Sequence, residues 1–132
     1  MAISNLFLRV GVLALIFGMG VGMYMGGNGD FSLRHTHAHT NLVGWASMMI
    51  FGFFYRFFPE AGQGWAARLH AGLAIPGLIL MIIGMIGTAK TENINFLLTK
   101  IGGELLMALG VLVFAVLVFR ATGRRSANSE PA

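Results

Sequence analysis

Residues 34–60 read RHTHAHTNLVGWASMMIFGFFYRFFPE, and this stretch decides the fold class. His35, His37 and His39 occupy every second position, and a largely apolar run follows them as far as Pro59. A membrane-spanning helix needs about 20 mostly apolar residues, and 37–58 meets that requirement. The stretch therefore predicts a membrane helix that carries histidines at one end.

Three other stretches have the same character, at 6–26, 69–88 and 101–121. The segments between them are short and contain helix breakers or polar residues, so consecutive helices are expected to be antiparallel. The sequence predicts an all-α fold, an integral membrane four-helix bundle over 1–121. A disordered cytoplasmic tail is expected over 122–132.

The composition supports a membrane location. Of the 132 residues, 56% are hydrophobic and 11% are charged, whereas a soluble domain carries about 25% charged residues. The absence of cysteine excludes disulfides, thiolate metal sites and covalent haem attachment. The net charge is +4, but the basic residues lie at the ends of the apolar segments. We therefore expect a lipid bilayer as the partner, and no nucleic acid.

The distribution of arginine and lysine predicts the orientation. Cytoplasmic ends of membrane helices carry an excess of these residues. One side would hold Arg9, Arg56, Arg68, Arg120, Arg124 and Arg125, and the other would hold Arg34, Lys90 and Lys100. Both termini are therefore expected in the cytoplasm of a cell with a bacterial-type inner membrane. The histidine cluster would lie on the outer side.

Helical geometry separates the three clustered histidines. Residues two apart differ by about 200° around a helix, so His37 and His39 face nearly opposite directions. They could not bind one metal together, but each could bind a separate planar cofactor. His35 could instead be a solvated loop residue. A further alternative is a copper or zinc site formed by all three in an extended segment. His70, near the start of the third helix, is expected to be a satisfied or solvated side chain.

Glycines and charged residues also have more than one interpretation. Gly18, Gly22 and Gly26 repeat every fourth residue, a spacing that lets helix backbones approach closely in lipid. Their simplest role is packing within the bundle, and the alternative is packing between subunits. Lys100 and Glu104 are predicted to form an ordinary i,i+4 ion pair, with a proton-relay role for Glu104 as the alternative.

The run HTNLVGWASMMIFGFFYRFFPE, residues 39–60, resembles the second membrane helix of subunit I of the haem–copper oxidase superfamily, and most of all the nitric oxide reductase and cbb3-type branch. The chain as a whole also resembles a group of small four-helix proteins described as oxidase-like. In the superfamily a helix-two histidine before a similar Thr-Asn-Leu run binds haem b, so the resemblance implies that His39 is a haem ligand. The chain departs from the family in having four helices instead of about twelve, and it lacks the later helices that carry the catalytic ligands.

The resemblance also implies an assembly. Subunit I has three arcs of four helices, and three copies of this chain would supply twelve. The segment HAH, ending at His39, resembles a His-x-His pair whose members bind different haems. We therefore predict a homotrimer in which each haem b is held by His39 of one subunit and His37 of its neighbour, with His35 as the substitute ligand. Arg34 would pair with a haem propionate.

The predicted function is that of a minimal oxidase-like subunit that transfers electrons through a bis-histidine haem. A quinol or a small redox protein would be the donor. The chain could be a component of an oxidoreductase, although a monomer lacks the family's full catalytic ligand set. Two alternatives are a haem sensor that binds NO or oxygen at an open axial position, and a non-catalytic assembly or accessory factor for a larger oxidase.

Overall fold

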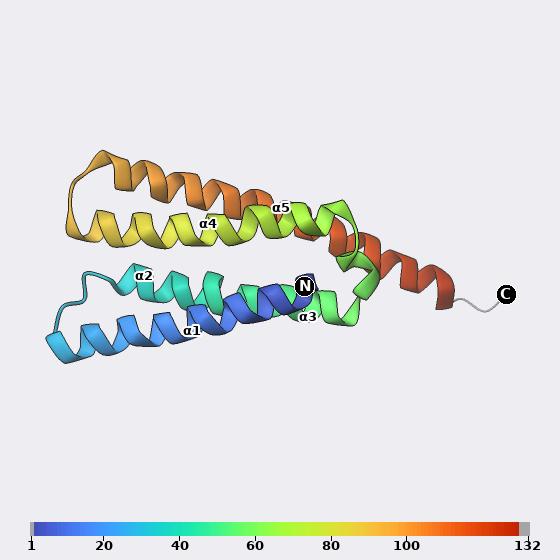
Figure 1. Cartoon of the computed structure of the whole chain (residues 1–132), viewed down its shortest axis with the longest axis horizontal. Coiled ribbons are helices and arrows are strands. Elements are labelled where there is room, and N and C mark those ends of the chain that lie inside the picture. Colours follow the sequence, from blue (N-terminus) through green and yellow to red (C-terminus); the bar gives the residue numbers. More distant parts are fainter. Residues whose placement is uncertain (1, 130–132) are drawn as a thin grey trace.

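The structure, a computed structural model, describes residues 2–129, with side chains through Gly123, and within that range it is entirely helical outside short loops. Four helical rods form two antiparallel hairpins that lie side by side (Figure 1). In the first hairpin, α1 (Ile3–Asn28) pairs with a rod built from α2 (Arg34–His39), the π-helix η1 (Thr40–Ser47) and α3 (Met48–Phe57). A 3₁₀ turn, η2 (Pro59–Gly62), leads to the second hairpin, α4 (Trp65–Lys90) and α5 (Ile94–Ser129).

The bundle has a histidine end and an arginine end. The histidine end contains the loops 29–33 and 91–93, and the arginine end contains the N-terminus and the connection 58–64. At the arginine end α5 extends beyond the other helices (Figure 1).

The first hairpin is held together by a regular seam on α1. The buried residues of α1 are separated by three or four positions, as in a coiled coil: Ser4, Phe7, Gly11, Ala14, Gly18, Val21 and Met25. Two glycines on this seam touch the partner rod so closely that an added Cβ would lie 3.0 Å from Met49 Sδ at Gly11 and 2.7 Å from Asn41 Oδ1 at Gly18. The seam therefore needs small residues, as is typical of helices packed in a membrane.

The second hairpin has an even closer seam, in which backbone meets backbone. A Cβ added to Gly103 would collide with the backbone nitrogen of Met81, and one added to Gly84 would collide with that of Lys100. At Gly77 the added atom would lie 2.7 Å from the nitrogen of Met107. The glycines thus allow α4 and α5 to approach until their backbones are in contact.

An aromatic cluster joins the two hairpins near the arginine end. Phe7 of α1 and Phe51 of α3 contact the ring of His70 on α4, with centroid distances of 4.8 and 4.6 Å. Phe114 of α5 contacts both Phe51, at 4.5 Å, and His70, at 5.2 Å. All four rods therefore contribute to one packed core, and aromatic pairs at these distances stabilise it beyond simple burial of area.

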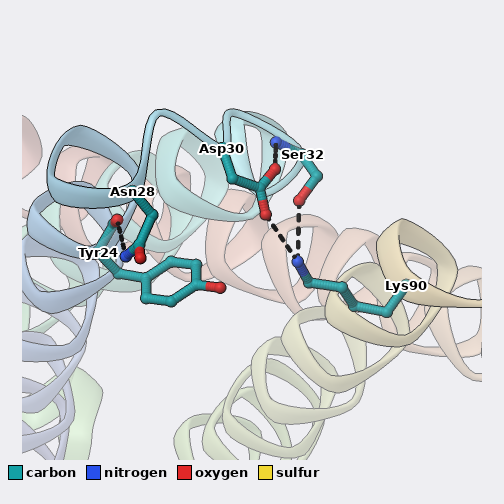
Figure 2. Close-up of polar contacts among 5 residues, drawn as sticks. All are labelled: Tyr24, Asn28, Asp30, Ser32 and Lys90. Atoms are coloured by element: carbon teal, nitrogen blue, oxygen red, sulfur yellow. Dashed lines mark hydrogen bonds and ion pairs between the residues drawn. The ribbon is translucent and has the colours of Figure 1, made fainter.

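At the histidine end the hairpins are connected by a polar clamp (Figure 2). Lys90 Nζ donates to Asp30 Oδ2 at 3.0 Å and to Ser32 Oγ at 3.1 Å, and Asp30 Oδ1 accepts from the backbone N–H of Ser32 at 3.0 Å. The loop reaches this position through Gly29, whose φ of 65° lies in the left-handed region that glycine adopts without strain. The clamp therefore fixes the α1–α2 loop to the end of α4.

The clamp predicts a measurable titration. The Ser32 N–H and then Lys90 lower the pKa of the Asp30 carboxyl from 3.8 to about 2. Because the folded pKa lies below the unfolded one, the clamp's contribution is fully present above 3.8 and is lost as the pH falls through about 2. We expect NMR of the Asp30 carboxyl carbon to show a midpoint near 2, and Lys90→Met to raise it only partly, because the Ser32 N–H remains. A wild-type midpoint at 3.8 would show that the clamp does not form in solution.

The structure confirms the predicted helices and extends them. Three are long and apolar enough to cross a membrane: Ile3–Asn28, Trp65–Lys90 and Ile94–Gly123. The fourth predicted span, 37–58, is helical from Arg34 to Phe57, but it changes from α to π and back, so no single element in it reaches that length. The loops are shorter than expected, because 65–68 and 94–100 are helical. Helix α5 continues through Ser129, so 122–129 is not the disordered segment expected there, and 130–132 lie outside the described residues.

Candidate functional site: a histidine pair on the second rod

The three clustered histidines lie in α2, which is a regular α-helix, so the angular separation predicted for them applies. His35 is exposed, whereas His37 and His39 are half-buried. His37 points toward α1, and the ring of His39 bonds to its own helix. The two inner histidines therefore serve different faces of the rod, as the sequence predicted.

The ring of His37 is seated in the α1 seam. Its Nδ1 lies 2.8 Å from the carbonyl oxygen of Gly18, and a Cβ on Gly22 would lie only 2.8 Å from its Cε1. Asn41 lies beside the ring and donates from Nδ2 to the carbonyl oxygen of His37 at 2.9 Å. Gly18 and Gly22 therefore pack within the bundle, which was the simplest of the predicted roles. Gly26 has nothing within 4 Å of an added Cβ.

The ring of His39 is held by the preceding turn of the same helix. Its Nδ1 lies 2.9 Å from the carbonyl oxygen of His35. Leu42 and Trp45, which follow on the same rod, have 66% and 40% of their surface exposed. Both are thus exposed apolar side chains that follow His39 within six residues, and Trp45 is not a core residue.

These contacts determine which ring nitrogen can act as a ligand. A carbonyl oxygen only accepts hydrogen bonds, so the contact of His39 Nδ1 assigns the proton to that nitrogen. At His37 the 2.8 Å contact with the Gly18 carbonyl oxygen is shorter than the 3.3 Å approach of Asn41 Nδ2 to the same Nδ1, and it favours the same tautomer. The neutral ring then has its lone pair on Nε2. Neither Nε2 makes a hydrogen bond to any residue that the structure describes. An Nδ1–H donated to a backbone carbonyl is the arrangement that commonly orients a histidine ligand toward a metal.

The rod leaves α geometry directly after the histidines. Residues 40–47 form a π-helix, and Ser47 Oγ donates to the carbonyl oxygen of Leu42, five residues earlier, at 3.0 Å. Thr40, at the start of this segment, is fully buried, and its Oγ1 has no hydrogen-bond partner in the described part of the chain. π segments occur frequently at functional sites, and nothing in the sequence predicted this one.

Arg34 is exposed at the end of the rod and forms no ion pair with any described residue. Its guanidinium is therefore available for an anionic group in front of the histidines. The alternative of a copper or zinc site required an extended segment, and 34–39 is helical instead. Among the residues described, no three histidine, aspartate or glutamate side chains come close enough to hold a metal ion.

His70 is a separate feature that the sequence did not reveal. It is 0% exposed, so it is not solvated, and Tyr55 Oη lies 2.8 Å from its Nδ1. Its Nε2 is buried without a hydrogen-bond partner among the residues described, so only one of its nitrogens is satisfied. His70 belongs to the aromatic core near the arginine end, one helix length away from His39, and the two histidines form separate environments.

The position of His37 predicts the effect of enlarging Gly22. We expect Gly22→Leu to displace the ring and break the Nδ1–Gly18 hydrogen bond, a loss of about 0.5–1.5 kcal/mol. Nitrogen NMR of the His37 ring should show a protonated Nδ1 in the wild type and a mixture of tautomers in the variant. Gly26→Leu is the matched control, because an added Cβ there meets nothing within 4 Å. An unchanged His37 spectrum in Gly22→Leu would contradict the packing of the His37 ring against Gly18 and Gly22.

The arrangement therefore holds two imidazole rings through Nδ1, His37 against α1 and His39 against its own helix, with Arg34 exposed at the end of the rod. Such nitrogens are ligands for iron, copper and zinc, and apolar surroundings favour a planar organic cofactor. Comparison of the chain with family models, with curated proteins and with solved structures found no match.

Proposed function

We propose that this chain is a multi-pass membrane protein that binds haem b, with Nε2 of His39 as an axial ligand. The membrane placement is supported by three long apolar helices and by the exposure of large apolar side chains such as Leu13, Met23 and Phe119. Such a surface requires lipid or other membrane helices around it.

The proposed orientation places both termini in the cytoplasm of a bacterial-type inner membrane. Four exposed arginines lie toward the arginine end, one on each rod: Arg9, Arg56, Arg68 and Arg120. The only acidic residue described near them is Glu60, whereas three basic and two acidic residues lie toward the histidine end: Arg34, Lys90, Lys100, Asp30 and Glu92. This asymmetry supports a cytoplasmic arginine end and an outer histidine end.

The observation that carries the haem proposal is the hydrogen bond from His39 Nδ1–H to the carbonyl oxygen of His35. It holds the ring as the tautomer whose Nε2 can bind iron, and it prevents the ring from rotating freely. Leu42 and Trp45 supply an apolar surface against which a porphyrin could pack. Arg34, exposed at the end of the rod, would pair with a propionate in a charge-assisted contact. A haem bound in this way supplies one-electron transfer, at a potential set by its axial ligands and by burial.

The second axial ligand is proposed to come from another copy of the chain. His37 and His39 use different faces of α2, so one rod can contribute to two sites. In a homotrimer His39 of one subunit would face His37 of the next, and His35 is exposed and could substitute. Two histidine ligands fill the coordination of the iron and suit electron transfer from a quinol or a small redox protein.

A second candidate function is favoured by the packing of His37 against its own α1 helix. Its ring lies against Gly18 and Gly22 of its own chain, which restrains it from approaching a haem on another subunit. If it stays there, the haem on His39 keeps one axial position open. The protein would then bind NO or oxygen, as a sensor does.

Reconstitution with haem tests the proposal and separates the two functions. Protein purified in mild detergent is titrated with haem, reduced, and exposed to carbon monoxide. Saturable binding with a low-spin b-type spectrum that carbon monoxide leaves unchanged supports the bis-histidine site, and the mass of the complex in detergent gives its number of copies. A carbon monoxide shift supports the open site. Failure to bind haem under any of these conditions contradicts both.

A further inference from the structure

Helix α5 carries a carboxylate at an unusual depth. Gly103 lies against Met81, and Lys100 lies against Gly84, which fixes the level of α5 relative to α4. Glu104 is therefore level with the middle of α4, about ten residues or 15 Å from the end of that helix at Lys90. In the proposed membrane placement, on which this inference rests, that level lies within the hydrocarbon core, which is about 30 Å thick.

Glu104 has no partner among the residues that the structure describes. Its side chain is exposed, and it makes neither a hydrogen bond nor an ion pair with any described residue. The ion pair predicted between Lys100 and Glu104 is not formed, since the ion pair present in the described part of the chain joins Lys90 to Asp30. An isolated carboxylate facing lipid is costly, and intramembrane charges almost always face a bundle interior or a water-filled cavity. The surface of α5 that carries Glu104 is thus expected to be covered.

The residues around Glu104 form a continuous face. At alternating steps of four and three, the spacing of a coiled-coil seam, the face contains Leu97, Ile101, Glu104, Ala108, Val111 and Ala115. All six are exposed or half-exposed, because the surface of α5 that contacts α4 is formed by other residues, such as Gly103 and Gly110. Ala108 and Ala115 are small, which favours close approach of a second helix.

We propose that this α5 face binds the same face of a second copy of the chain, with the two α5 helices parallel. Copies of a membrane protein share one orientation, so parallel packing places residues of equal number at equal depth. Lys100 lies one turn above Glu104, with its backbone and Cβ against Gly84, and forms no ion pair with any described residue. Across a parallel seam the two Glu104 side chains meet at the same depth, and Lys100 of each copy, one turn away beside the face, lies within reach of Glu104 of the other, so that the four charges compensate one another. These charges are then neutralised inside the membrane.

Cysteine cross-linking tests the contact cleanly, because the chain contains no cysteine of its own. Ala108→Cys lies on the proposed face, and Leu109→Cys, on an exposed neighbouring position, is the matched control. After oxidation in membranes, Ala108→Cys should form disulfide-linked dimers at least about tenfold more than Leu109→Cys, because a disulfide needs Cα atoms within about 7 Å. Equal cross-linking at the two positions, or none at Ala108→Cys, overturns the proposal.

Exchanging the charges of Glu104 and Lys100 tests whether the partner that covers the α5 face is a second copy of the chain. In the Ala108→Cys background, Glu104→Lys or Lys100→Glu alone should reduce cross-linking, and the double exchange should restore it. If another protein covers the face, the double exchange will not restore cross-linking, and this result rejects a second copy as the occupant. Glu104→Gln, which keeps the size of the side chain, should also weaken the contact, and undiminished cross-linking in that variant contradicts the role of the pair. Cross-linking does not depend on haem, and membrane fractionation of the same samples separates failure of this contact from failure of the membrane placement.

Discussion

His39→Ala should abolish haem binding while the helices remain intact. The substitution removes the Nε2 lone pair that the His35 carbonyl holds in place, and it leaves no other group at that position. Loss of an outer partner of a metal ligand reduces affinity by about 10–100-fold, so loss of the ligand itself should exceed that range. The effect is measured by titrating the purified variant with haem and following the Soret band, with circular dichroism as the check on helix content.

Variants at the neighbouring histidines make the test specific. His35→Ala should bind haem normally, because the backbone carbonyl that orients His39 is retained. His37→Ala should keep the haem but, if His37 is the second ligand, should open the iron to carbon monoxide. Retention of haem in His39→Ala together with its loss in His35→Ala would show that His35 is the ligand and that the proposed assignment is wrong.

Gly103→Ala should disrupt the α4–α5 hairpin. The new Cβ would collide with the backbone nitrogen of Met81 and lie 2.7 Å from the carbonyl oxygen of Gly77, and neither atom can move without separating the helices. Overpacking of a well-packed interior costs about 1–3 kcal/mol. We expect the free energy of unfolding of Gly103→Ala, measured by denaturant titration in detergent micelles, to fall about 1–3 kcal/mol below that of Gly102→Ala.

Gly102→Ala is the matched control for this substitution. It is the adjacent residue on the same helix, and an added Cβ there meets nothing within 4 Å. Both variants gain the same helix propensity of about 1 kcal/mol, so their difference isolates the collision. Equal stability of the two variants would mean that the backbones of α4 and α5 are not in contact at this level.

The helices and the separation of the histidines could be predicted from the sequence because both depend on local pattern. Hydrophobic length identifies each helix, and the 100° step per residue places His37 and His39 on different faces. The π-helix at 40–47 could not be predicted, because no residue type or spacing specifies it.

The contacts between residues far apart in the chain also could not be predicted from the sequence. The Lys90–Asp30 clamp joins positions 60 residues apart, and the Tyr55–His70 pair forms only after the two hairpins dock. The glycines of the α4–α5 seam recur at seven-residue intervals, Gly77 and Gly84 on α4 and Gly103 and Gly110 on α5, but the residue that each one contacts on the other helix appears only when both helices are present. For Lys100 and Glu104 the local i,i+4 rule predicted a pair that the structure does not form.

The central claim is that this chain binds haem b through His39, and a reduced-minus-oxidised spectrum of the wild-type protein tests it most directly. The protein is expressed in haem-replete cells, purified from the membrane fraction in mild detergent, and compared with His39→Ala prepared in parallel. The account predicts a sharp low-spin b-type difference spectrum in the wild type and none in the variant. A wild-type protein that is stably folded and contains no haem would contradict it.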